Sequence, residues 1–295
     1  MSSVINFLPA KTFLAGEYLA LEKREGLVLL TNPCFQMEYK SGQHLNIHPE
    51  SPAGRYYEDH LSYFKNYNIE FKDPFLKHKK AGVGASTAQF LGLYSFKNPV
   101  FTDSDLLSTY LKYFTGSVRP SGVDILAQNH QNISSIEGGH VQEVLWPFKD
   151  LSFLIFFTGV KLNTHEHLES LKNLETSHFS TALSKIKKGL FEGQTENFLQ
   201  GLNDYDQELR RQSFLAPSTK DILNRIHQID EIQSQKIILA SKGCGAMGSD
   251  SFILIVPRKF RDFTKERVLK NIFQGDEAYF LAHEEHLYQK ENQSL

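Results

Sequence analysis

The segment that most constrains this 295-residue chain is Ala81-Gly82-Val83-Gly84-Ala85-Ser86-Thr87-Ala88. Two glycines precede a hydroxyl pair and an apolar run, a pattern that predicts a tight loop opening a helix. Glycine lets the backbone approach a ligand closely, and the first N–H groups of a helix are free to bind an anion. The segment indicates either a phosphate-binding loop or a plain strand-to-helix turn, because short glycine patterns alone do not separate the two.

The composition limits the class of protein. Hydrophobic residues make up 40% of the sequence and include 23 phenylalanines, which is enough for a substantial core. The net charge of −2 does not favour a nucleic-acid partner. No apolar run is long enough to span a membrane, and the first residues lack a signal-peptide pattern. Cys34 and Cys244 form no disulfide framework. We therefore expect a soluble, cytoplasmic protein that binds neither nucleic acid nor membrane.

The sequence pattern changes near residue 150, where we place a boundary between units 1–150 and 151–295. Short strand patterns come first and long helical patterns follow, which predicts an α+β protein of two domains. In the first unit we expect strands at 12–15, 27–31, 35–40 and 44–48, with a hairpin at Ser41-Gly42, and helices at 86–96 and 104–114, the second capped by Asp103. In the second unit we expect strands at 151–158, 236–241 and 251–256, a glycine turn at 243–248, and helices at 164–174, 180–191, 195–214 and 218–229, the last with a capping box at Ser218.

Four segments carry residues that could do chemistry. The first is the glycine loop, residues 82–86, and the second is Lys11 at the start of a predicted strand. The third is Asp124 after the turn Pro120-Ser121-Gly122-Val123. The fourth is the glycine-dense connection from Lys242 to Asp250, which contains the last turn, residues 243–248. Each has an ordinary structural explanation as a turn, a cap or a solvated side chain. Their order along the chain is more specific than any one of them.

In that order the four segments resemble the GHMP small-molecule kinases, named for their galactose, homoserine, mevalonate and phosphomevalonate members. The resemblance spans nearly the whole chain. Ser121-Gly122-Val123-Asp124 and residues 157–164 look most like mevalonate kinases, whereas Gly16-Glu17-Tyr18 and Asp250 look more like phosphomevalonate kinases. The resemblance implies a domain like the second domain of ribosomal protein S5, then a ferredoxin-like domain, with the active site between them.

The resemblance also implies a role for each segment in moving a phosphoryl group from ATP to an alcohol. Asp124 would accept the proton of the substrate hydroxyl, and Lys11 would pair with Asp124 and stabilise the developing alkoxide. The ATP phosphates would be held by Gly82, Gly84, Ala85, Ser86 and Thr87, with Ser86 also near Mg²⁺, and by Gly245 and Ala246 of the last turn. The substrate side would include Glu17, Tyr18, Ser121, Gly122 and Thr158.

Three positions depart from the family pattern. Ala85 replaces a serine, Met247 stands where the last motif carries glycine, and Tyr113 occupies the place of a Mg²⁺-binding glutamate of mevalonate kinases. Mg²⁺ would then be held by phosphates, Ser86 and water. Otherwise the metal site lies elsewhere or the kinase is weak. Because of these departures, an alternative remains: the protein has the same fold and binds a ligand but does not catalyse a reaction.

The expected function is phosphorylation of an alcohol by ATP and Mg²⁺, with mevalonate, an isoprenoid precursor, as the leading substrate. Phosphomevalonate is the alternative, because Arg119 beside the Asp124 turn could bind a second phosphate. The sequence does not determine the oligomeric state, and a homodimer is left open. The segment His283-Glu284-Glu285-His286 is expected to be a solvated helix face, because its histidines are three residues apart and not four.

Overall fold

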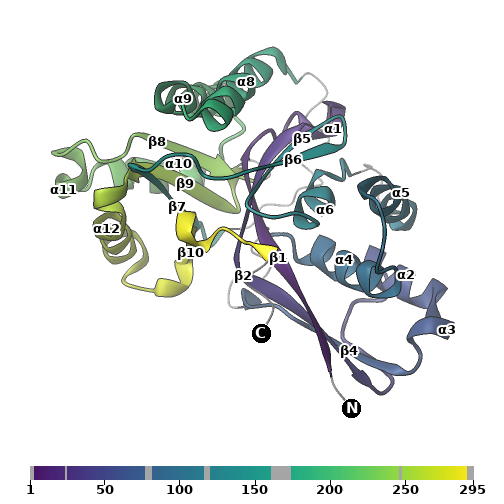
Figure 1. The fold of residues 1–295 in the computed structure, drawn as a ribbon. Helices are drawn as coiled ribbons and strands as arrows, with labels where there is room; N and C mark the ends of the chain where they lie inside the picture. The colour runs from purple at the N-terminus through teal and green to yellow at the C-terminus, as the bar shows by residue number, and fades with distance from the viewer. Residues whose placement is uncertain are drawn as a thin grey trace.

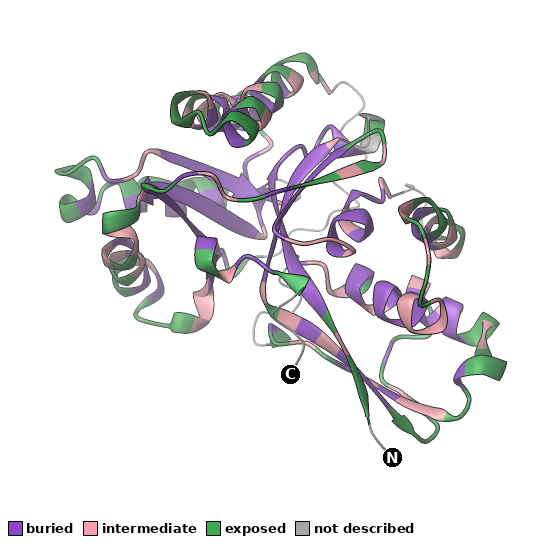
Figure 2. Ribbon diagram, viewed as in Figure 1, coloured by how far each residue is buried: buried purple, intermediate pink, exposed green. Residues whose placement is uncertain are grey.

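The computed structural model describes residues 3–23, 25–76, 82–115, 120–160, 174–245 and 248–290. Those residues form two β-sheets with helices packed around them (Figure 1). The first sheet has the strand order β3-β4-β2-β5-β6, with β1 paired to β2. The second sheet has the order β10-β7-β9-β8. Figure 2 shows that buried residues concentrate in the strands of both sheets and in the facing sides of the helices.

Two long strands organise the first sheet. β1 (Val4–Ala15) and β2 (Gly26–Ser41) pair antiparallel along most of their length. The second half of β1 is buried at every position, as in a strand covered on both faces. The sheet is completed by β3 (His44–Leu45), β4 (Tyr67–Lys72), β5 (Ile133–Glu137) and β6 (His140–Val144).

Helices cover one side of the long strands, and the second sheet lies on the other side (Figure 1). The core beneath these helices is rich in aromatic rings, which include Tyr56, Phe90 and Tyr110. The helices of this part are α1 (Ala20–Lys23), α2 (Pro52–Asp59), α3 (Leu61–Phe64), α4 (Ala85–Lys97), α5 (Asp103–Tyr113) and α6 (Val123–Gln128).

The second sheet is antiparallel and is built from β7 (Leu151–Phe157), β8 (Ala240–Cys244), β9 (Ser251–Pro257) and β10 (Phe280–His283). If β7, β8, β9 and β10 are numbered 1 to 4, the strand order across the sheet is 4-1-3-2. Helices follow the first strand, β7, and the third strand, β9, which is a ferredoxin-like arrangement. The helices are α8 (Ser177–Glu192), α9 (Thr195–Arg211), α10 (Pro217–His227), α11 (Asp230–Gln233) and α12 (Arg261–Phe273), and short 3₁₀ turns are η4 (Arg258–Phe260), η5 (Glu277–Tyr279) and η6 (Glu284–His286).

The C-terminal segment returns to the first sheet. Leu287 bridges Thr31, and the Tyr288 N–H donates to the Leu30 carbonyl at 2.8 Å. The Asn132 N–H in turn donates to the Tyr288 carbonyl at 2.8 Å. The end of the second unit is therefore hydrogen-bonded to the sheet of the first. The boundary near residue 150 falls between β6 and β7 and stays a prediction.

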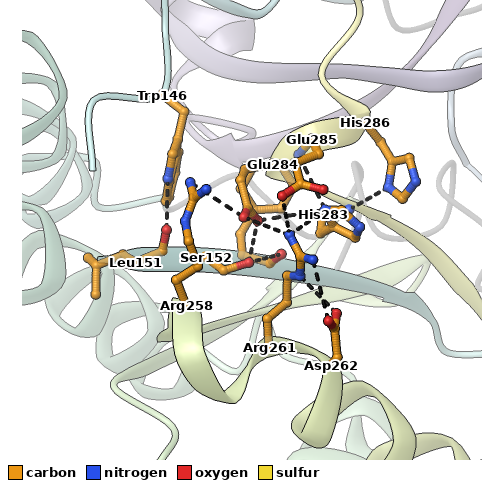
Figure 3. A network of polar contacts seen from close by, with 11 residues as sticks. Trp146, Leu151, Ser152, Arg258, Arg261, Asp262, His283, Glu284, Glu285 and His286 are labelled. Atoms are coloured by element: carbon orange, nitrogen blue, oxygen red, sulfur yellow. Dashed lines mark hydrogen bonds and ion pairs between the residues drawn. The ribbon is translucent and has the colours of Figure 1, made fainter. Parts of the chain in front are cut away.

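A polar network anchors this returning segment (Figure 3). The Glu284 carboxylate is buried, accepts a hydrogen bond from the Ser152 hydroxyl and lies 3.1 Å from an Arg261 guanidinium nitrogen. His283 and His286 stand beside it with ring centroids 4.1 Å apart. The expectation of a solvated helix face is wrong here, because η6 is a 3₁₀ turn whose Glu284 faces the interior.

Several local predictions in the first unit are also wrong. The expected strands 27–31 and 35–40 are one strand, β2. No hairpin forms at Ser41-Gly42, because β3 pairs in parallel with β4, which lies between it and β2. The cap of α5 is Thr102 and not Asp103: the Thr102 hydroxyl accepts from the Asp105 N–H, and the Asp105 carboxylate accepts in return. Lys11 lies inside β1 and not at its start.

In the second unit, the structure differs from prediction at α10 and β8. α10 begins at Pro217 behind Ala216, and no side chain caps it, so the capping box at Ser218 does not form. β8 spans Ala240–Cys244 instead of 236–241, so Lys242 lies in the strand, and Gly243 and Cys244 belong to the strand and not to the expected turn. Residues 164–173 of the expected helix at 164–174 lie outside the described part of the chain. Among the described residues, no helix is both long and apolar enough to cross a membrane.

Candidate active site

The glycine loop lies directly against β1. The Lys11 backbone N–H donates to the Val83 carbonyl at 3.0 Å, which fixes the loop to the strand. Gly82 and Gly84 have φ angles of +72° and +94°, where side chains are strained. A Cβ on Gly84 would lie 2.8 Å from the Lys11 Cγ and from the Gln128 side-chain nitrogen. Glycine at this position therefore allows the loop to pack on the lysine.

The start of α4 presents backbone N–H groups beside this loop. Gly84 is the N-cap residue and no side chain caps the helix, so the first-turn N–H groups are available for an anion. Ser86 is exposed on that turn, and Ala85 is half-buried. Thr87 is buried, and its hydroxyl hydrogen-bonds with the Gln128 side-chain oxygen and the Gly84 carbonyl. Ser86 is therefore the hydroxyl of this pair that faces solvent.

Lys11 and Asp124 meet beside the loop. The Lys11 Nζ lies 3.0 Å from the Asp124 Oδ1, and the two side chains are 10% and 37% exposed. Asp124 belongs to the first turn of α6, which begins at Gly122 with a φ of +80°. A Cβ on Gly122 would overlap the Leu107 side chain, so glycine permits this tight entry. The buried lysine thus holds a carboxylate that a substrate can still reach.

Two hydroxyls expected on the substrate side bond to backbone groups of the protein. The Ser121 Oγ accepts from the Val123 N–H at 3.2 Å. The buried Thr158 hydroxyl hydrogen-bonds with the Ser249 carbonyl, and its backbone N–H donates to the Asp250 carbonyl at 3.2 Å. Both hydroxyls therefore have partners within the protein, and their contact with a substrate stays a prediction.

Glu17 and Tyr18 lie where the first unit meets the second. The Tyr18 ring is buried and stacks on Phe214 and Phe179 at centroid distances of 4.5 and 5.5 Å. The Glu17 carboxylate forms an ion pair with Lys242 of β8, and their side chains are 7% and 0% exposed. These two expected substrate residues thus join the two units in this structure.

Lys242 is the residue of this region that the sequence interpretation missed as a functional candidate. Its Nζ donates to Glu17 and to the Gly243 carbonyl at 2.7 Å, and lies 5.2 Å from the centroid of the Tyr205 ring. Burial opposes its charge, but the Glu17 carboxylate outweighs burial and raises the pKa of Lys242. One sequence feature could have indicated the burial of Lys242: it directly follows the run 237–241, whose first four residues are apolar, and such a run favours a buried strand.

Asp250 connects the two glycine segments. A Cβ on Gly82 would lie 2.3 Å from the Asp250 Oδ2, and a Cβ on Gly245 would lie 2.4 Å from the same atom. The carboxylate therefore packs on both the first glycine loop and the last turn. Ala246 and Met247 lie outside the described residues, as do Arg119 and the lysines at 77, 79 and 80.

Tyr113 does not substitute for an acid. Its ring packs edge-on against Tyr56 at 5.3 Å, and burial and a hydrogen bond with Asp59 raise the pKa of Tyr113 to about 12. In the part of the chain that the structure describes, no three His, Cys, Asp or Glu side chains gather into a metal site. The residues fit a Mg²⁺ ion carried by nucleotide phosphates, which needs few protein ligands, better than an ion held by the protein alone.

Comparisons with known proteins agree with this architecture. No protein-family model matches the sequence, and no curated protein matches it. Among solved structures, the Methanococcus jannaschii mevalonate kinase is 17% identical, with a TM-score of 0.66 over 93% of this chain and 96% of that chain. The Streptococcus pneumoniae phosphomevalonate kinase is 13% identical, with a TM-score of 0.71 over 96% and 99%. The homoserine kinase of Cytophaga hutchinsonii is 13% identical, with a TM-score of 0.63 over 98% and 94%.

These similarities span both units of the chain. The resemblance to GHMP kinases is therefore confirmed at the level of the fold, and so is the expected two-domain α+β architecture. At identities of 12–17% the similarity does not determine the substrate.

Proposed function

We propose that this protein is an ATP-dependent kinase that phosphorylates the hydroxyl of a small-molecule alcohol. The observation that carries the proposal is the Lys11–Asp124 ion pair, with 3.0 Å between Nζ and Oδ1, packed against a glycine loop that opens α4. Backbone N–H groups for an anion, a cation and an accessible carboxylate are the parts that phosphoryl transfer requires. The fold is one that mevalonate, phosphomevalonate and homoserine kinases share.

In this proposal each group has a defined task. The N–H groups of the loop and of the first turn of α4 hold the phosphates. Asp124 accepts the proton of the substrate hydroxyl as its oxygen bonds to the γ-phosphorus and the bond to ADP breaks. Lys11 stabilises the negative charge that develops on that oxygen. Mg²⁺, held by the phosphates, water and Ser86, would neutralise charge on the phosphates.

Mevalonate is the proposed substrate, and phosphomevalonate is the alternative. A second substrate phosphate needs additional cations, and the sequence assigns no basic cluster to the substrate side. The alternative is supported by the Streptococcus pneumoniae enzyme, which was solved with phosphomevalonate and AMPPNP and has a TM-score of 0.70 to this chain.

A second candidate function is ligand binding without catalysis. Tyr113 favours it, because this residue occupies the position of a metal-binding acid and is engaged with Tyr56 and Asp59. Without an acid there, the metal would be held less firmly.

A substrate panel tests the proposal and separates the two candidates. ATP consumption by the purified protein is measured with mevalonate, phosphomevalonate, homoserine and galactose, each with and without Mg²⁺. We expect Mg²⁺-dependent turnover with mevalonate. Turnover with phosphomevalonate alone would transfer the proposal to that substrate. Binding of ATP without turnover on any alcohol would reject the kinase and leave the ligand-binding protein.

A further inference from the structure

Gln128 is a buried amide that bonds to two other elements of the candidate site. It is the last residue of α6, is 2% exposed and follows Asp124 by four residues, so both side chains lie on the same face of that helix. Its Nε2 donates to the Pro9 carbonyl of β1 at 2.7 Å. Its side-chain oxygen accepts a hydrogen bond from the Thr87 hydroxyl in the first turn of α4. One side chain thus joins α6 to both β1 and α4.

These two hydrogen bonds require an amide at position 128. The Pro9 carbonyl can only accept, so its partner must be a donor. A carboxylate could accept from Thr87 but could not donate to Pro9, and a thioether could not donate to Pro9 either. The amide uses its donor and its acceptor on different elements, so it holds those elements at a fixed separation.

The same amide packs against the glycine loop. A Cβ on Gly84 would lie 2.8 Å from the Gln128 Nε2 and 2.8 Å from the Lys11 Cγ, so the loop rests on both side chains. Lys11 follows Pro9 by two residues in β1 and pairs with Asp124 of α6 at 3.0 Å. The loop, the lysine and the carboxylate of the proposed function therefore belong to, or adjoin, the three elements that Gln128 connects.

We propose that Gln128 is a positioning residue for phosphoryl transfer, which sets the first turn of α4 in place relative to the Lys11–Asp124 pair. This inference rests on the proposed function, because it assumes that the phosphates lie at the glycine loop. Gln128 touches neither the phosphates nor the alcohol, and it acts through its hydrogen bonds to Thr87 and Pro9. A misplacement of about 1 Å between reacting groups can cost about 10²-fold in rate, so this connection affects turnover more than binding.

Gln128→Met tests the inference, because methionine has a similar length but cannot make the bond to Pro9 and accepts only weakly from Thr87. Turnover is measured at saturating ATP with the alcohol that the wild type phosphorylates best, and ATP binding is measured by titration calorimetry. We expect kcat to fall by about 10²-fold. The Kd for ATP and the number of ATP sites per chain should change little, because the phosphates are held within one element and the displacement lies between elements.

A second variant breaks the connection at its other end. Thr87→Val keeps the shape of the side chain but removes the hydroxyl that donates to Gln128. Its kcat should fall by a smaller factor, because the bond to Pro9 remains. The double variant Thr87→Val/Gln128→Met should be no slower than Gln128→Met, since both changes break the same connection. If Gln128→Met melts below the assay temperature, Thr87→Val carries the test alone.

A matched control is Asn46→Leu, which removes another amide that both donates and accepts. The Asn46 side chain donates to the Phe71 carbonyl at 2.9 Å and accepts from the Phe71 N–H at 2.7 Å. The urea unfolding of all variants is compared with their turnover. Asn46→Leu should lose stability but keep the kcat of the wild type.

Three outcomes overturn the inference on its own. If Gln128→Met keeps the kcat of the wild type, the amide only stabilises the fold. The same holds if kcat falls in proportion to a loss of ATP sites. If Thr87→Val and Gln128→Met lower kcat independently, so that their factors multiply in the double variant, the hydrogen bond between them is not the cause. A wild type that phosphorylates no alcohol of the panel would instead reject the proposed function before any variant is compared.

Discussion

At the residue scale, the candidate site consists of glycines that let the loop pack on Lys11 and of hydroxyl groups that bond within the protein. The two glycines and their order with Lys11 and Asp124 indicated the site. Thr87 was expected to contact phosphates, yet its hydroxyl is occupied by Gln128, which lies 41 residues further along the chain. A local sequence pattern does not reveal a hydrogen-bond partner that is so distant in the sequence. The same holds for Thr158, whose hydroxyl bonds to Ser249.

Gly84→Ala tests the need for glycine at the loop. The added Cβ would have to occupy a backbone with φ of +94° and would overlap the Lys11 and Gln128 side chains. We expect a loss of about 1–3 kcal/mol in the free energy of unfolding from backbone strain alone, and weaker ATP binding as Lys11 shifts. Gly138→Ala is the control, because its φ is +59° but nothing lies within 4 Å of the added Cβ. Equal ATP affinity in both variants would contradict the close packing of the loop.

At the element scale, hydrophobic patterning located α4, α5, α8, α9 and α10, gave no indication of α2 and α12, and misplaced β8. The strand was expected to end at residue 241, and its true span, Ala240–Cys244, brings a lysine into the interior. A buried lysine contradicts simple patterning, and its main charge partner is Glu17, 225 residues away in sequence. Long-range ion pairing of this kind cannot be predicted from local periodicity.

Removing one partner of that pair should be costly. Lys242→Met leaves the Glu17 carboxylate buried without its cation, and we expect a loss of about 3–5 kcal/mol in the free energy of unfolding by urea. The double variant Glu17→Gln/Lys242→Met should recover most of that loss. Arg225→Met, which removes one partner of an exposed pair with Asp221, should cost less than about 1 kcal/mol. A double variant no more stable than Lys242→Met would count against the pair as the cause.

The network around η6 gives the protein a pH dependence with a defined sign. Burial, then His286 and Arg261, lower the pKa of His283 to about 4, against 6.5 as its ordinary value. Between these values the unfolded chain binds this proton and the folded protein does not, so stability falls as the pH falls. His283→Gln lacks this proton. Its free energy of unfolding should therefore approach or exceed that of the wild type as the pH is lowered from 7 to 4.5, in urea titrations at both pH values. If His283→Gln instead lost more stability than the wild type at low pH, the predicted direction of the pH dependence would be wrong.

At the scale of the whole molecule, motif order specified the architecture better than any single element did. The change from strand patterns to helical patterns predicted an α+β protein of two domains, and the order of the four segments implied the GHMP kinase fold, which the solved kinases share over nearly the full chain. The return of residues 287–288 to the first sheet was not expected, because it depends on backbone pairing with Thr31 and Leu30 that leaves no motif in the sequence. The contacts that join the two units were therefore the feature of the fold that the sequence predicted least well.

The proposed function depends on Asp124 as the group that accepts the proton of the substrate hydroxyl. The most direct measurement is the steady-state turnover of Asp124→Asn with ATP, Mg²⁺ and mevalonate, alongside its affinity for ATP. We expect kcat to fall by about 10²–10⁴-fold while the Kd for ATP stays nearly unchanged, since the amide keeps the shape of the side chain but cannot take the proton. Turnover equal to that of the wild type would contradict the central claim.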